Sequence, residues 1–184
     1  MKLQPRLTYF AALVLAGMLT AFIPACRSLP SQKEVVEETV ITVVAVDQTA
    51  LLSLLNAYRA DRGLDPLQLD ATLNHVSVEM ARHIAERDSM DTWAHSVFGL
   101  SSRLDKAGYA NYAAAENLGA GYADLNAAFA GWQGSEGHNK NLLNPHVTRV
   151  GIGRTLRSNG KWRNFWALTL ARPKEDGRPV VATR

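Results

Sequence analysis

The sequence predicts an α+β domain in which helices pack on a small antiparallel sheet. Apolar residues recur at three- and four-residue spacing in several stretches of the chain, which indicates amphipathic helices. Two apolar stretches near the C-terminus flank an Asn-Gly pair, which is a strong signal of a β-hairpin. A lone hairpin is not stable in water, so its apolar side must pack against the helices.

The bulk composition is that of a globular protein. With 184 residues the chain is long enough for one domain with a proper core, and its composition excludes a disordered or fibrous protein. The formal net charge of +3 is spread along the chain, without a long run of like charges. We therefore expect no nucleic-acid partner.

Residues 1–25 are predicted to be an export signal peptide. Lys2 and Arg6 precede an apolar, uncharged stretch from Leu7 to Ile23, and small residues follow it. This stretch is slightly short for a membrane span, which needs ~20 residues. Cleavage is therefore expected, with an uncleaved membrane anchor as the alternative.

Cys26 follows the apolar stretch and is the only cysteine, which excludes an intramolecular disulfide. The segment "IPAC" resembles a bacterial lipobox, and the resemblance implies that Cys26 is lipidated and becomes the new N-terminus. The alternative is an incidental free cysteine. We expect an exported lipoprotein of the cell envelope, anchored in a membrane and facing the periplasm or the surface.

Residues 26–46 are predicted to be a tether, and residues 47–172 the globular domain. Within the tether, the apolar residues 39–46 are expected to form a strand or an extended arm against the domain. Residues 173–184 are polar and are predicted to be a loose C-terminal tail.

Two helices are predicted at the start of the domain. Asp47 is the expected N-cap of the first helix, which ends near Gly63, and Asp70 is the expected N-cap of the second. His83 lies in the second helix with His75 and Glu79, at a spacing that can bind a metal. A helical wheel turns these residues away from the apolar stripe or to its flank, so a solvated face explains them.

The segment 88–122 is predicted to be irregular, apart from a short helix around residues 100–108. A connection of this length inside a compact domain is often functional. A third helix is expected after Asp124, then a short helix that Pro145 ends. The final hairpin turns at Asn159-Gly160.

Five polar residues of irregular segments or helix ends stand out as candidate site residues: His95, Glu116, Ser135, Glu136 and His138. Two histidines with one or two carboxylates suit a divalent cation such as zinc, which keeps an open position for water when it is catalytic. The same residues would also suit a hydrogen-bonded pair that only holds loops in place.

Four short motifs, in this order, resemble the SCP/CAP superfamily of cysteine-rich secretory, antigen 5 and pathogenesis-related proteins. They are "HS" at 95–96, "ENL" at 116–118, "W…S.GH" at 132–138 and "GIG" at 151–153. The resemblance covers about residues 48–172 and is to the short envelope proteins of bacteria. It implies an α-β-α sandwich.

The resemblance also implies a binding cleft of two histidines and two glutamates that can hold a divalent cation. His95, Glu116 and His138 match three of these positions, which makes His95 and His138 the expected metal ligands. Ser135 stands at the position of the second glutamate, and Glu136 is its neighbour and possible stand-in.

Three functions are compatible with these residues. The first is a binding protein that takes a small ligand or a lipid in the cleft, with or without a cation. The second is a metal-assisted, protease-like hydrolase in which Glu116 or Glu136 acts as the base. The third is a purely structural polar network in an envelope interaction protein. We expect the chain not to be an enzyme.

Overall fold

The computed structural model describes residues 37–179. The predicted signal peptide, Cys26 and the last five residues lie outside the described residues. The described strands form one sheet in the order β1-β4-β5-β3, with β2 pairing in parallel with β4. The strands are β1 (Ile41–Val44), β2 (Gln68–Leu69), β3 (Asn111–Ala120), β4 (Arg149–Arg157) and β5 (Asn164–Pro173).

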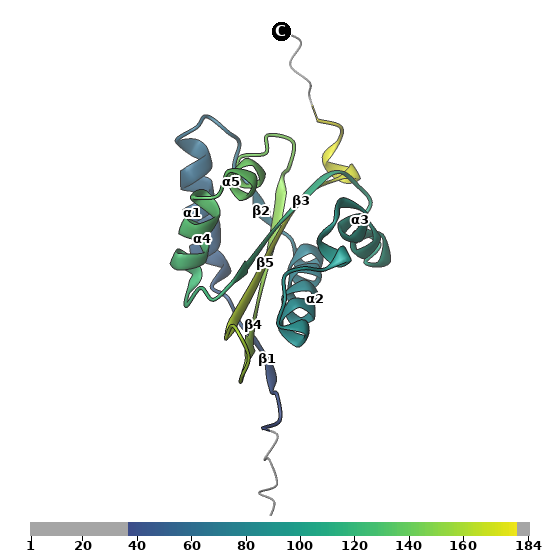
Figure 1. Ribbon diagram of the computed structural model, residues 1–184. Helices are drawn as coiled ribbons and strands as arrows, with labels where there is room; N and C mark the ends of the chain where they lie inside the picture. Colours follow the sequence, from purple (N-terminus) through teal and green to yellow (C-terminus); the bar gives the residue numbers. More distant parts are fainter. Residues whose placement is uncertain (1–36, 180–184) are drawn as a thin grey trace, which may run out of the picture. The chain divides into compact units, whose positions relative to one another are not determined.

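Helices cover both faces of this sheet, as Figure 1 shows. One face carries α1 (Gln48–Ala60), α4 (Leu125–Gln133) and α5 (Glu136–Leu142), and the other carries α2 (Ala71–Arg87) and α3 (Val97–Lys106). Two short 3₁₀ helices complete the fold, η1 (Trp93–His95) and η2 (Lys174–Asp176). The predicted α-β-α sandwich is confirmed.

The helix starts follow from their N-caps. The carboxylates of Asp47, Asp70 and Asp124 accept hydrogen bonds from the third backbone amide that follows each of them. Each bond satisfies one of the amides that have no partner inside the helix. The predicted helix starts are therefore confirmed, and so is the hairpin around Asn159-Gly160.

Two expectations about irregular chain were wrong. Residues 111–120 form the ten-residue strand β3, which pairs antiparallel with β5 at the edge of the sheet. The predicted loose tail starts within β5, and residues 174–176 form η2. Asp176 holds η2 to β4 through a two-point ion pair with Arg149. The apolar residues before the domain form β1, which pairs with β4.

Two glycines of β4 let α2 lie directly on the sheet. A Cβ at Gly151 would stand 2.1 Å from the backbone carbon of Leu73, and one at Gly153 would stand 2.4 Å from the backbone nitrogen of Val78. Such contacts are far inside van der Waals distance. The motif "GIG" therefore serves the close approach of a helix to a strand.

Between residues 37 and 179, no helix combines the length and the apolar composition needed to cross a bilayer.

Replacing Gly151 by alanine should destabilise the fold by roughly 1–3 kcal/mol, because the new methyl group overpacks α2 against β4. Urea unfolding followed by circular dichroism measures this change. The control is Gly137→Ala in α5, where a Cβ meets nothing within 4 Å. This control should be neutral or gain up to about 1 kcal/mol. Equal stability of the two variants would contradict the close-packing argument.

Candidate functional site

The candidate site is built on two consecutive residues of the edge strand β3. Side chains alternate between the faces of a sheet, so Glu116 and Asn117 point to opposite helical layers. The side chain of Glu116 faces η1 and α3, whereas that of Asn117 faces α5. One strand thereby fixes chain segments on both sides of the sheet.

The carboxylate of Glu116 is the best-connected group of the site. Its side chain is only 2% exposed, and Oε2 accepts from Nδ1 of His95 at 3.0 Å. Nη2 of Arg103 lies 2.8 Å from both carboxylate oxygens. Arg103 also donates to the backbone carbonyl of Ala94, beside His95. A buried carboxylate is thus paired with a cation from α3.

Arg103 was not among the predicted site residues. It lies on an amphipathic helix in a segment rich in polar residues, where an arginine normally faces solvent. Its partner is 13 residues away along the chain. One general rule points to such a residue, because a buried glutamate needs a cation nearby. The sequence has several basic residues that could fill this role, so the rule does not single out Arg103.

The position of His95 follows from a tight reversal of the chain. Thr92 caps η1, and the hydroxyl of Ser96 accepts from the amide of Gly99 at the start of α3. A Cβ at Gly99 would stand 2.4 Å from the carbonyl oxygen of Trp93. The glycine therefore lets α3 fold back over η1, which holds the imidazole of His95 next to β3.

His138 is held by α5 on the other side of the strand. The side-chain amide of Asn117 donates to the backbone carbonyl of His138 at 3.0 Å. Asn141 donates to the side chain of Asn117 at 2.9 Å and to the backbone carbonyl of Glu116 at 3.2 Å. On the outer side of α5, Tyr58 donates to Asn139. The backbone around His138 is thus fixed from two directions.

His95 and His138 line one pocket of about 230 Å³. The rest of the lining is mostly apolar: Met90, Leu118, Gly119, Ala120 and Tyr122. Burial lowers the pKa of His138 below its usual value, and the nearby His95 lowers it further. The imidazole of His138 is therefore neutral at pH 7, with one donor and one acceptor.

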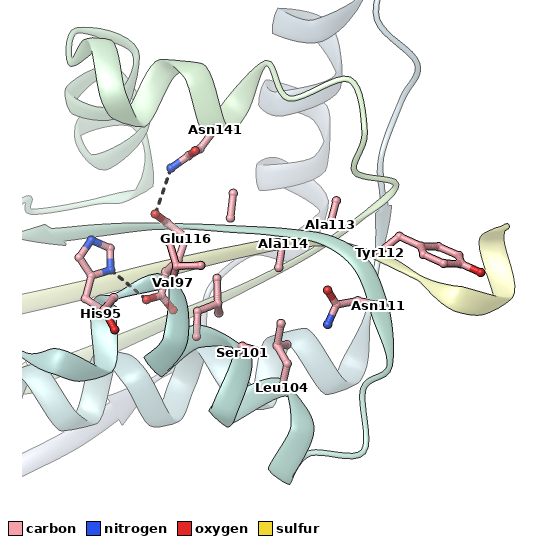
Figure 2. A pocket seen from close by; sticks show the side chains of 13 residues that line it. His95, Val97, Ser101, Leu104, Asn111, Tyr112, Ala113, Ala114, Glu116 and Asn141 are labelled. Atoms are coloured by element: carbon pink, nitrogen blue, oxygen red, sulfur yellow. Dashed lines mark hydrogen bonds and ion pairs between the residues drawn. The ribbon is translucent and has the colours of Figure 1, made fainter. Parts of the chain in front are cut away.

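A second hollow, of about 430 Å³, continues from His95 along the free edge of β3 (Figure 2). Val97, Leu100 and Leu104 of α3 form one wall, and Asn141 of α5 stands on the other side. Its floor is the strand segment 111–116.

Ser135 and Glu136 do not line the pocket of the two histidines. Glu136 is exposed in the first turn of α5, where a negative charge is favourable to the helix dipole. Ser135 occupies the N-cap position, but its hydroxyl makes no capping hydrogen bond, contrary to the expected cap.

The donor set does not suit a zinc site. Both oxygens of Glu116 are engaged by Arg103, and one also by His95, which leaves two imidazoles. A catalytic zinc usually has three protein ligands. Over residues 37–179, no group of three or more histidine, cysteine, aspartate and glutamate side chains is placed to hold a metal ion. His75, Glu79 and His83 of α2 are therefore not placed to hold a metal ion either.

Comparisons with known proteins agree with the fold. A model of the cysteine-rich secretory protein family, CAP, matches residues 52–169. In Bacillus subtilis, the protein YkwD is 29% identical over 110 residues, and the membrane protein YlbC is 30% identical over 121 residues. These alignments cover 60% and 66% of this chain, but the chain spans only 43% and 35% of those proteins.

Solved structures give the same result. An extracellular SCP-domain protein of Bacillus anthracis is 28% identical with a TM-score of 0.57, over 67% of this chain and 39% of that one. An outer surface protein of Borrelia burgdorferi is 22% identical with a TM-score of 0.63, over 73% of this chain and all of that one. The second likeness shows the fold alone.

Replacing Arg103 by methionine should cost about 3 kcal/mol of stability, because it leaves the buried carboxylate of Glu116 without its cation. Urea unfolding at pH 7 measures this loss. Arg82→Met removes an arginine whose ion pair with Glu86 is about half exposed, and it should cost less than about 1 kcal/mol. Similar losses in both variants would mean that the Arg103 pair carries no special weight.

The lowered pKa of His138 should make stability depend on pH. The folded state takes up this proton less readily than the unfolded state, so stability is full above pH 6.5 and falls as the pH drops through and below that value. His138→Gln should flatten this part of the curve. In NMR titrations, His95→Gln should raise the pKa of His138, and His75→Gln should leave it unchanged. A pKa of His138 above 6.5 would contradict the assignment.

Proposed function

Since this chain belongs to the CAP (cysteine-rich secretory protein) family, we propose that it is an exported envelope protein whose cleft binds a small ligand. The ligand we propose is a partly apolar molecule with a neutral, hydroxylated head group, such as a lipid of that kind.

The observation that carries this proposal is the pocket of His95 and His138. Two imidazoles from opposite helical layers lie in one hollow whose other walls are largely apolar. Ligand pockets in proteins have this composition: an apolar lining with a few polar groups that fix orientation. The bonds from Glu116 to His95 and from Asn117 to the backbone of His138 hold both residues in place before any ligand arrives.

The protonation of His138 favours a neutral head group. A neutral imidazole offers one donor and one acceptor, and a hydroxyl group can bond to either of them. A carboxylate ligand would gain an ion pair only from a protonated imidazole, which burial and the nearby His95 disfavour.

Export and anchoring are the second part of the proposal. Their support is the basic and apolar N-terminal pattern, the place of Cys26, and the relative in Bacillus anthracis, which is an extracellular protein. The mass of the membrane-extracted protein reports whether Cys26 carries a lipid.

A hydrolytic function has less support. Within residues 37–179, neither His95 nor His138 makes a ring hydrogen bond to a serine or threonine hydroxyl, and Glu116 is occupied by Arg103. The hydroxyl of Ser96 accepts from the amide of Gly99 as a helix cap. Neither histidine of the pocket is therefore paired with a hydroxyl that it could activate as a nucleophile.

The ligand proposal can be tested with 1-octanoylglycerol, an uncharged amphiphile with two hydroxyl groups. In NMR titrations of the folded domain, it should shift the signals of His95, His138, Leu118 and Tyr122. His138→Phe should weaken binding about tenfold, the equivalent of one lost hydrogen bond.

His75→Phe is the matched control, because His75 is exposed on α2 outside this pocket, and it should bind as the natural chain does. Octanoate tests the head group and should bind more weakly at pH 7. Shifts that are confined to other surfaces, or tighter binding of octanoate, would overturn the proposal.

A further inference from the structure

We propose that the hollow beside β3 is a separate site for an extended peptide, which binds by adding a strand to the free edge of β3. This goes beyond the histidine pocket, because the contacts it uses are backbone groups of β3 around Ala114 and not the imidazoles.

The direction of the backbone groups of β3 can be read from its side-chain contacts. Trp132 donates its indole N–H to the carbonyl of Leu118, and Asn141 donates to the carbonyl of Glu116. Backbone groups of a strand alternate between its two edges. The register with β5 is irregular between Asn111 and Ala113. From Ala113 onward, the even-numbered residues of β3 therefore turn their N–H and C=O groups to the free edge, and the odd-numbered ones turn theirs to β5.

The chain closes one part of this edge and leaves another open. Side chains donate hydrogen bonds to the backbone carbonyls of Glu116 and Leu118. Ala114 is the preceding residue that faces this edge, and within the described residues no side chain bonds to its carbonyl. Proteins normally cover or blunt an exposed strand edge, because it pairs readily with other chains. An opening at Ala114, in the floor of a hollow of about 430 Å³, therefore fits a binding edge.

The side chains around Ala114 leave room for a strand. Residues 113–115 are three alanines, so only methyl groups project from this part of β3. Leu100 and Leu104 form an apolar wall on the α3 side, and Asn141 stands on the other side. A residue paired with Ala114 would direct its side chain to the leucines, and its neighbours would face Asn141. We therefore expect an apolar residue flanked by small polar ones.

Charge sets the direction of the peptide. The guanidinium of Arg178 lies 5.5 Å from the ring centre of Tyr112, at the far end of the hollow, and has no ion-pair partner in the described part of the chain. A peptide antiparallel to β3 would end at Tyr112. Its C-terminal carboxylate would then lie beside Arg178. Recognition of the peptide would thus have two parts, which are strand pairing at Ala114 and binding of the free carboxylate by Arg178.

The test uses fluorescein-labelled hexapeptides of alanine, valine, serine and threonine with a free C-terminus, measured by fluorescence polarisation with the folded domain. At least one peptide should bind with a micromolar dissociation constant. N-methylation of the amide opposite Ala114 should weaken binding about tenfold, whereas methylation of the next amide should have little effect. Amidation of the C-terminus or Arg178→Gln should weaken it about threefold or more.

A variant of the protein tests the same edge. Ala114→Pro removes only an outward N–H and should abolish peptide binding, because the bonds to β5 come from the odd-numbered residues. Val43→Pro makes the same change on the other edge strand, β1, where Val40 bonds to Ser158 and Val43 therefore faces outward. This control should bind peptide normally.

The two sites give opposite patterns. Ala114→Pro should leave 1-octanoylglycerol binding intact, and His138→Phe should leave peptide binding intact, so failure of one proposal does not imply failure of the other. The peptide proposal is overturned if no hexapeptide binds, or if N-methylation shows no alternation. It is also overturned if the exposed Trp93, Val97 and Phe98 beside the hollow bind phosphatidylglycerol vesicles and no peptide, which would make this face a membrane contact.

Discussion

The carboxylate of Glu116 is the interaction on which the other parts of the site depend. It is buried at the edge of the sheet, and Arg103 and His95 reach it from α3 and η1. Removing it would leave the mostly buried guanidinium of Arg103 without its anion and His95 without its partner on β3. Because the next side chain, Asn117, anchors α5 on the other side, two adjacent residues determine where both histidines stand. The cleft therefore depends on the alternation of side chains between the two faces of β3, and neither histidine can be positioned independently of this strand.

Much of the fold could be predicted from local signals. Aspartate caps placed the helix starts, and the Asn-Gly pair placed the hairpin, because both depend on a few neighbouring residues. The strand β3 was missed because "NYAAAENLGA" is rich in alanine and poor in the β-branched residues that favour strands. Only its pairing with β5, some fifty residues later, makes it a strand. Tertiary pairing thus overrode local preference at the element that carries the site.

The site residues divide along the same line. His95, Glu116 and His138 were predicted from family motifs, and the structure brings them to one edge of the sheet. Glu136 was included as a neighbour of Ser135, but position in sequence does not decide which way a helix turns a side chain, and it is exposed. Arg103 carries no motif of its own. Its role follows from the need of a buried charge for a partner, which becomes visible only once Glu116 is known to be buried.

The indole of Trp132 has a consequence for the behaviour of the protein at high concentration. By occupying the carbonyl of Leu118, it takes away one of the groups through which two copies of β3 could join edge to edge. Continuous pairing of such edges is the first step toward fibrils. Trp132 is a buried core residue, and its hydrogen bond to β3 also opposes self-association of the protein. Because Trp132 lies on α4, the solubility of the chain depends on the packing of that helix.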